Sequence, residues 1–344
     1  MEAGTVVLDA VGPPPPGDPR ERRRVRSAGT LGDRLFRGGA RSSGLVVLAI
    51  MASVGLFLLL RGLQALNAVG PLKFITTQAW NPDTHQFGIA AVLTGSVLIA
   101  LVAICVALPL AAGTALFISE IAPRRAQRFL ISLVDLMAAV PSVVYGLWGL
   151  FFLQANVVGL ARWISTWFGW IPVFHVNGAD PTNPLASSSV YTASTFVAGI
   201  TVALMVAPIA CSIMREVFSQ APMGEREGAY ALGATRWGMI ATVVVPFGRG
   251  GIIGGTMLGL GRALGETIAV YMIISPQFSI QAHILQGGAS SVSALIALRY
   301  GDASQFGMSA LMAAGLSLFL LTLIVNFSAS IVVSRSRSGA QSEV

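Results

Sequence analysis

Charged residues are scarce in this chain. Asp, Glu, Lys and Arg together make up 11% of the 344 residues, while 54% are hydrophobic. An average globular domain has about 25% charged residues. A chain this poor in charge cannot cover its own surface in water, so the composition excludes a soluble enzyme and predicts a protein that lies in a lipid bilayer.

Lysine is almost absent, and its absence excludes one route to ATP binding. A Walker A loop ends in Gly-Lys-Ser/Thr, whereas the single lysine, Lys73, follows Leu72. The apolar stretches also lack a Ser-His-Asp grouping and paired carboxylates at helical spacing, which disfavours a membrane enzyme acting on lipid. We expect no enzymatic activity and no cofactor in the chain itself. If the chain moves a solute uphill, a partner must supply the energy.

Metal ligands are equally few. Both cysteines, Cys105 and Cys211, lie inside apolar stretches, and we interpret them as packing residues. The three histidines are far apart in sequence: His85, His175 and His283. We therefore expect no metal site.

Long apolar runs dominate what remains. At about 20 residues per crossing, six stretches can span a bilayer: 44–66, 89–119, 131–154, 190–214, 250–275 and 304–333. The first is long for a signal peptide and no Ala-x-Ala site follows it, so we expect an anchor that is retained. Residues 1–43 are rich in Pro, Gly and Arg and predict a disordered tail. The expected fold is all-α: a polytopic membrane domain over 44–334, with its core at 89–333, and a short tail at 335–344.

The arginines indicate the orientation. Eight precede the first apolar run, and the segments 120–130, 215–249 and 334–344 carry three, four and two more. The intervening segments carry only Arg61, Lys73, Arg162 and Arg299. This asymmetry predicts that both termini are cytoplasmic in a multi-pass cell-membrane protein. Because the arginines are spread between the runs rather than gathered on one face, we expect no nucleic-acid partner.

The longest cytoplasmic segment, about 215–249, carries a spaced motif. Glu227, Ala229 and Gly233 are followed, after nine residues, by Val243-Val244-Val245-Pro246. This resembles the coupling-loop signature of ABC importer permeases, Glu-Ala-Ala-x3-Gly-x9-Ile-x-Leu-Pro, with Gly228 where alanine is usual. A short helix that ends at a turn glycine can sit in a groove of another protein. The alternative is an ordinary connector that matches by chance.

The fifth apolar stretch combines small and charged residues. At about 100° per residue, Gly251, Gly255, Gly259, Arg262 and Glu266 fall within an arc of roughly 80°. The glycines allow a neighbouring helix to approach closely, and the charges must face protein or a water-filled cavity. Two interpretations stay open: a structural ion pair, or a pathway in which the Arg262 guanidinium meets an oxyanion and Glu266 orients or gates it.

Three segments give the chain a family resemblance: Trp80-Asn81-Pro82 with Gln86-Phe87-Gly88, then Val140–Gly149, then Gly261–Thr267. Over about 70–334 the chain resembles the PstC type of phosphate-specific ABC permeases. The resemblance implies a MetI-like, type I importer architecture, with Arg262 and Glu266 at the charged positions linked to phosphate translocation. It also implies three partners: a PstA-like second permease, a PstB-like ATPase dimer, and a PstS-like extracytoplasmic phosphate-binding protein.

Two rivals and three smaller features stay open. The rivals are a permease of the same fold for another oxyanion, such as sulfate or molybdate, and an ion-gradient carrier that works alone. Pro141 is expected to interrupt the third stretch, either as a simple kink or as part of the pathway. Asp135 is expected to be a boundary charge. The outer segment 155–189 is expected to carry an interfacial helix or to dock the binding protein.

Overall fold

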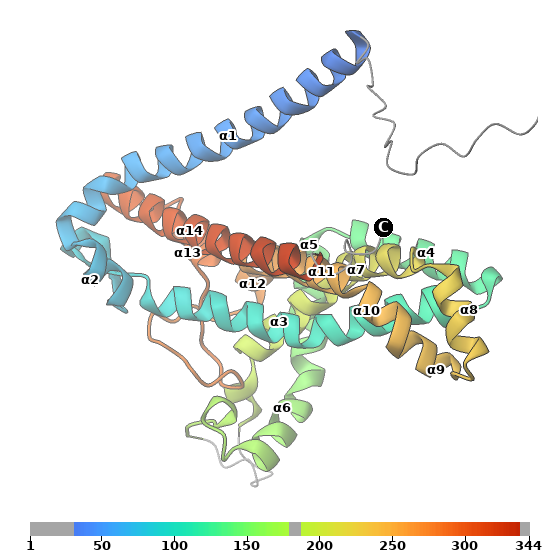
Figure 1. The fold of residues 1–344 in the computed structure, drawn as a ribbon. Coiled ribbons are helices and arrows are strands. Elements are labelled where there is room, and N and C mark those ends of the chain that lie inside the picture. The colour runs from blue at the N-terminus through green and yellow to red at the C-terminus, as the bar shows by residue number, and fades with distance from the viewer. Residues whose placement is uncertain (1–30, 179–186, 338–344) are drawn as a thin grey trace, which may run out of the picture. The chain divides into compact units, whose positions relative to one another are not determined.

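The computed structural model describes residues 31–178 and 187–337, most of which are helical (Figure 1). The chain divides into two compact units, Met1–Ser53 and Val54–Val344. In the first unit, the described residues form the beginning of helix α1 (Leu31–Val69). Residues 31–43 are therefore helical and not disordered; they contain no proline, so a helix formed by the following apolar run can extend back through them. The remainder of the expected tails, 1–30 and 338–344, lies outside the described residues.

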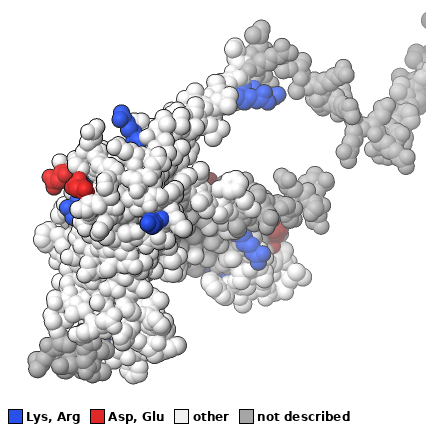
Figure 2. All heavy atoms as spheres, turned by 90° about the vertical axis from the view of Figure 1, so that its left-hand side faces the viewer, with Lys and Arg blue, Asp and Glu red and all other residues white. Residues whose placement is uncertain are grey.

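The apolar helices match the expected number of membrane spans. Five described helices are long and apolar enough to cross a membrane: Leu35–Val69, Ala90–Ile121, Ser142–Phe168, Thr195–Ser219 and Gln305–Ser328. A sixth span results if Arg236–Phe247 and Arg249–Gly265, which meet at 65°, are counted as one. The face in Figure 2 carries only a few charged groups on a mostly uncharged surface, as the composition predicts for a protein in a bilayer.

Two long helices form the centre of the second unit. Helices α3 (Ala90–Leu116) and α7 (Thr195–Ser219) make the most extensive contact in the chain. Alanines spaced four residues apart on α3, including Ala103 and Ala107, are completely or almost completely buried. Their small side chains let α7 approach closely. Helices α11 (Arg249–Gly265) and α14 (Gln305–Arg337) complete the bundle, with α11 against α3, α7 and α14.

The third expected span is interrupted, so the predicted range 131–154 is wrong as a continuous helix. Helix α4 (Arg124–Ala139) ends before Pro141, and α5 (Ser142–Trp148) continues through the π-helical turn Gly149–Leu153 into α6 (Gln154–Phe168). Proline lacks an N–H and disfavours a helical residue before it, and Val140 is extended. The hydroxyl of Tyr145 donates to the carbonyl of Met137 at 2.9 Å, which satisfies one acceptor freed by the break.

The fifth expected span, 250–275, is also interrupted. Helix α11 ends at Gly265, Glu266 is extended, and α12 (Ile268–Ile273) follows. Helix α12 packs against α5. The two short helices approach closely: a Cβ added to Gly146 of α5 would lie 2.9 Å from Cα of Ala269. The two interrupted helices therefore meet directly after their breaks.

A small aromatic cluster holds the segment between α1 and α3. Helix α2 (Pro71–Thr76) leads into a hairpin of β1 (Trp80–Asn81) and β2 (Gln86–Phe87), joined by the 3-10 turn Pro82–Thr84. Trp80 pairs with Phe87 in the antiparallel register. The Phe87 ring also meets Phe74 and Phe306 edge to face. This cluster fixes the hairpin against the start of α14.

The connector between α12 and α13 (Val292–Arg299), which lies between the fifth and sixth expected spans, is structured. The N–H of Phe196, at the start of α7, donates to the carbonyl of Ile284 at 2.9 Å, and the N–H of Gly287 donates to Val190 at 2.7 Å. Leu285 is fully buried. Two 3-10 turns border this region, Pro172–Phe174 and Ser188–Tyr191. The connector is therefore part of the folded unit.

The segment that follows α7 consists of short helices. They are α8 (Met223–Ala231), α9 (Arg236–Met239), the π-helical turn Ile240–Val244 and α10 (Val245–Phe247). Another π-helical turn, Phe117–Ile121, ends α3 nearby. This segment contains the spaced motif found in the sequence.

Candidate functional site

The spaced motif forms a helix–turn–helix. Helix α8 carries Glu227 and Ala229 and ends at Ala231. Gly233 follows two residues later, and its φ of 85° lies in the left-handed region that favours glycine. The N–H of Gly233 donates to the carbonyl of Tyr230 at 2.9 Å. The hydroxyl of Thr235 then caps α9 by accepting the N–H of Gly238 at 3.1 Å. Glycine and threonine therefore set the turn between the two helices.

One side of this helix–turn–helix is open. Glu227 is exposed, and Leu232 at the tip of the turn is 91% exposed. Trp237 on α9 is 67% exposed. Pro246, the last residue of the motif, is half-buried in α10 and therefore lies away from this surface. Large apolar side chains at an exposed turn, next to a free carboxylate, suit insertion into a groove of another protein.

The other side of α8 is held by an ion pair that the sequence reasoning missed. Arg226 Nη1 lies 3.0 Å from Oε2 of Glu120, with side-chain exposures of 15% and 3%. Arg226 Nη2 also donates to the carbonyl of Phe218 at 2.7 Å. Glu120 could have been identified as a candidate from the sequence, because it is an acidic residue immediately after the charge-free stretch 89–119.

The glycine stripe of α11 faces the centre of the bundle. A Cβ added to Gly251 or Gly259 would lie 2.6 Å from a carbon of Val217 or Val206, respectively, both on α7. At Gly255 it would lie 3.0 Å from the carbonyl oxygen of Ala210. These are closer than ordinary carbon contacts of about 3.5–4.0 Å. The absence of side chains at these positions therefore sets the distance between α11 and α7.

Arg262 lies outside this buried face. It is exposed in the last turn of α11, whereas the next two residues, Ala263 and Leu264, are buried. Among the described residues, no hydrogen bond or ion pair holds its guanidinium. The charge is thus directed away from the core of its own chain, near the paired breaks.

Glu266 occupies the break itself, and it is not on the helix face predicted for it, because α11 ends one residue earlier. The side chain is buried, and its Oε1 accepts the N–H of Ala269 at 3.3 Å at the start of α12. The carbonyl of Glu266 accepts the hydroxyl of Ser293 at 2.7 Å. Among the described residues, Glu266 forms no ion pair with Arg262. Its contacts in this conformation hold the two ends of the break together.

Serines next to Glu266 were not predicted as site residues. The hydroxyl of Ser291 caps α13 by accepting the N–H of Ala294 at 3.1 Å and lies 3.1 Å from the hydroxyl of Ser293. Ser96 of α3 accepts the N–H of Val292 at 2.9 Å. All are buried. The sequence signal was the run Ser290-Ser291-Val292-Ser293 before an apolar segment, which is typical of a helix N-terminus.

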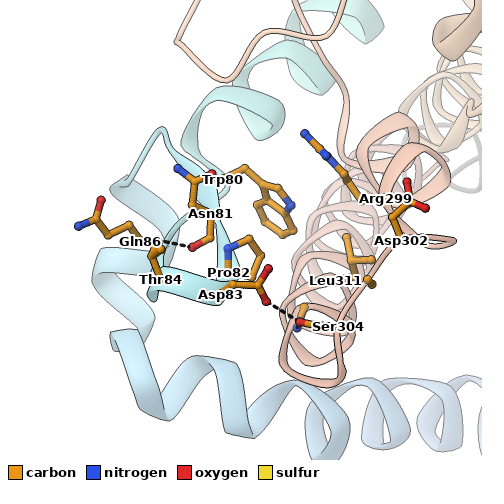
Figure 3. Close-up of a pocket in the computed structure, with 12 residues that line it drawn as sticks. Trp80, Asn81, Pro82, Asp83, Thr84, Gln86, Arg299, Asp302, Ser304 and Leu311 are labelled. Carbon is orange, nitrogen blue, oxygen red and sulfur yellow. Dashed lines mark hydrogen bonds between the residues drawn. The ribbon is translucent and has the colours of Figure 1, made fainter.

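A charged cavity of about 520 Å³ opens between the hairpin and the α13–α14 turn (Figure 3). The carboxylate of Asp83 accepts the hydroxyl of Ser304 at 2.6 Å, which ties the two sides together. Arg299 and Asp302 also line it. No group of three or more potential metal-ligating side chains occurs among the described residues. Asp83, Arg299 and Asp302 place charges of both signs around the cavity.

The family described as "Binding-protein-dependent transport system inner membrane component" matches residues 107–338, more than half of the sequence. The chain belongs to this family. The match includes the helix–turn–helix of α8 and α9, the glycine stripe and both ends of the break at Glu266. The chain is therefore a multi-pass permease component of the membrane. Permeases of such transport systems work with partner subunits.

Curated relatives confirm the resemblance found in the sequence. The phosphate transport system permease protein PstC 2 of Mycobacterium tuberculosis is 36% identical over 311 residues, which cover 90% of this chain and 94% of the relative. PstC of Mesorhizobium japonicum is 36% identical over 317 residues, covering 90% and 93%. PstC of Xylella fastidiosa (strain 9a5c) is 37% identical over 290 residues, covering 84% and 86%.

A solved structure supports the fold. The crystal structure of a bacterial ABC transporter involved in the import of the acidic polysaccharide alginate aligns with a TM-score of 0.51 at 16% identity. The alignment covers 88% of this chain and 99% of that chain. At this identity only the fold is comparable. The predicted all-α permease fold of an ABC importer is confirmed.

Proposed function

We propose that the chain forms one of the two permease halves of an ATP-driven importer of inorganic phosphate. The observation that carries this proposal is the set of relatives named as phosphate transport permeases, which align with about nine-tenths of the chain. A transport subunit of this kind carries out no covalent chemistry. Its residues bind, exclude and release the anion while the helices move.

The ATPase is the partner that we place at the α8–α9 turn. The sequence offers no Walker A loop, so the energy must come from another subunit, for which a PstB-like ATPase dimer is the natural candidate. Glu227, Leu232 and Trp237 would enter a groove on its surface, with Gly233 setting the turn. The alternative, a connector without a partner, would leave two large apolar side chains, Leu232 and Trp237, in water.

Arg262 is the residue that we propose for the phosphate pathway. It is exposed and unpaired among the described residues, whereas a guanidinium at membrane depth must face protein or water. A PstA-like second permease would enclose it in a shared pathway. There its planar fork suits the oxygens of a tetrahedral anion. Glu266 would act as a positioning residue that keeps the break, and with it the end of α11, in place.

The orientation follows from the arginine asymmetry. We propose cytoplasmic termini in the cell membrane, with the α8–α9 turn inside and the hairpin outside. A PstS-like binding protein would then deliver phosphate from outside. The charged cavity of Figure 3 and the tryptophan-bearing helix α6 are the two surfaces that we propose for its docking.

Reconstitution tests the proposed function. Proteoliposomes that hold both permeases and the ATPase, with the binding protein outside, should concentrate radiolabelled phosphate when ATP is present on the ATPase side. Omission of the ATPase should abolish accumulation. Accumulation of phosphate by the purified chain alone would overturn the proposal and favour a carrier that works without ATP.

Competition separates phosphate from other oxyanions. Excess unlabelled phosphate should suppress the uptake, whereas excess sulfate or molybdate should leave it unchanged. The opposite pattern would keep the permease architecture but assign it to another anion. The same proteoliposomes serve for both measurements.

A further inference from the structure

The ion pair between Arg226 and Glu120 joins two parts of the chain that 106 residues separate. Arg226 directly precedes Glu227 in α8. Successive residues of an α-helix point about 100° apart, so Arg226 can face the bundle while Glu227 faces outward. The observed burial follows this division, because Glu227 is exposed and both side chains of the ion pair are largely buried.

Helix α8 has few other attachments to the bundle. The elements that it packs against most closely are α9 and the π-helical turn Ile240–Val244. On its inner side, Ala229 lies three residues after Arg226 and reaches the apolar cluster around Phe218 and Met239 only as a half-buried side chain. The long side chain of Arg226 therefore connects α8 directly to the turn that ends α3.

The partners of Arg226 belong to the two central helices. Glu120 lies in the π-helical turn that ends α3, and the Phe218 carbonyl lies in the last turns of α7. One guanidinium thus connects α8 to the same ends of both helices. Since α3 and α7 share the largest helix–helix contact in the chain, a displacement of Arg226 acts on them together.

We propose that the Arg226–Glu120 pair is the mechanical link through which α8 moves α3 and α7 during the transport cycle. This proposal rests on the proposed function, in which an ATPase displaces α8. The exposed side of α8 receives the motion, and the charged side passes it to the bundle. Arg226 and Glu120 are positioning residues: neither contacts the ATPase or the anion.

The geometry explains why a charged link suits this task. Both charged side chains are largely buried, so removal of either charge would leave the other without its partner in a buried site. The pair is thus costly to separate. It resists being pulled apart when α8 moves, as a force-bearing contact requires.

The test measures phosphate uptake and ATP hydrolysis on the same reconstituted complex of both permeases, ATPase and binding protein. The variants are Glu120→Gln, Arg226→Gln and the charge exchange Glu120→Arg with Arg226→Glu. Controls are Arg124→Gln and Arg128→Gln, both exposed on α4. Each single variant should keep the ATPase bound but should transport at least about fivefold less phosphate per ATP hydrolysed. Coupling free energies between two sites of a protein typically correspond to changes of about 5–150-fold.

The charge exchange keeps the proposal falsifiable if a single variant fails to assemble. It should transport more phosphate per ATP than either single variant, because the attraction is restored in reverse, and the two controls should match the unaltered complex. Full coupling in both single variants, or a charge exchange no better than either of them, would overturn the link. Failure of the unaltered chain to bind the ATPase would instead overturn the proposed function.

Discussion

Replacement of Gly251 by alanine tests the close contact between α11 and α7. The added Cβ would lie 2.6, 2.7 and 3.0 Å from three side-chain carbons of Val217, which is about 1 Å inside an ordinary carbon contact. Val217 is β-branched and therefore has little rotamer freedom in a helix. Overpacking of this kind costs about 1–3 kcal/mol.

Gly254 of the same helix is the matched control. A Cβ added there meets nothing within 4 Å, so Gly254→Ala should gain only the helix propensity of alanine, about 0.8–1 kcal/mol. Both variants share this gain. The difference in the free energy of unfolding between Gly251→Ala and Gly254→Ala therefore isolates the cost of overpacking. This cost is about 1–3 kcal/mol, or roughly 5- to 160-fold in the unfolding equilibrium constant.

Tryptophan fluorescence during SDS-induced unfolding in mixed micelles measures this difference. Gly254→Ala should unfold at a higher SDS concentration than the unaltered chain. Gly251→Ala should unfold at a clearly lower SDS concentration than Gly254→Ala. Gly255→Ala should lie between them, because its nearest neighbours include the flexible side chain of Met214. Equal unfolding of all three variants would refute the reasoning that the stripe sets the helix distance.

Three further predictions concern function. Arg262→Gln should abolish phosphate uptake while the complex still assembles, and Arg262→Lys should restore part of it; normal uptake by the Gln variant would remove Arg262 from the pathway. Glu266→Ala should lower stability by about 0.5–2 kcal/mol through the lost cap on α12, whereas Glu266→Gln keeps the acceptor and should lose less in the same SDS assay. Gly233→Ala should cost about 1–2 kcal/mol in the left-handed turn and reduce copurification of the ATPase. Gly228→Ala should not, because a Cβ added there meets no neighbour. Equal copurification of the two variants would contradict the role of the turn.

The sequence predicted four of the six spans as continuous helices, because apolar stretches of about 20 residues or more have few alternatives to crossing a membrane. The break at Pro141 was also foreseeable, since proline removes a donor. The break after Gly265 was not. It depends on the contacts of Glu266 with Ala269 and Ser293, which form only when α12 and α13 come together.

Side chains far apart in sequence explain the other differences. Glu120 and Arg226 looked like unrelated residues because only the tertiary structure brings them within 3.0 Å. Helix α13 was missed because eight residues are too few for a recognisable period among loop residues. By contrast, the turn at Gly233 was predicted from local chemistry, but the role of Arg262 stays a prediction that the transport assay must test.

The structured connector between α12 and α13 has a practical consequence for experiments on intact cells. Since its backbone is hydrogen-bonded to the beginning of α7 through Ile284 and to the preceding 3-10 turn through Gly287, a reporter tag inserted there would disturb a central helix. A cysteine for surface labelling suits the exposed residues near Gly301 better, because a side chain added at that glycine meets no neighbour. Topology mapping should therefore use that position and leave the connector intact.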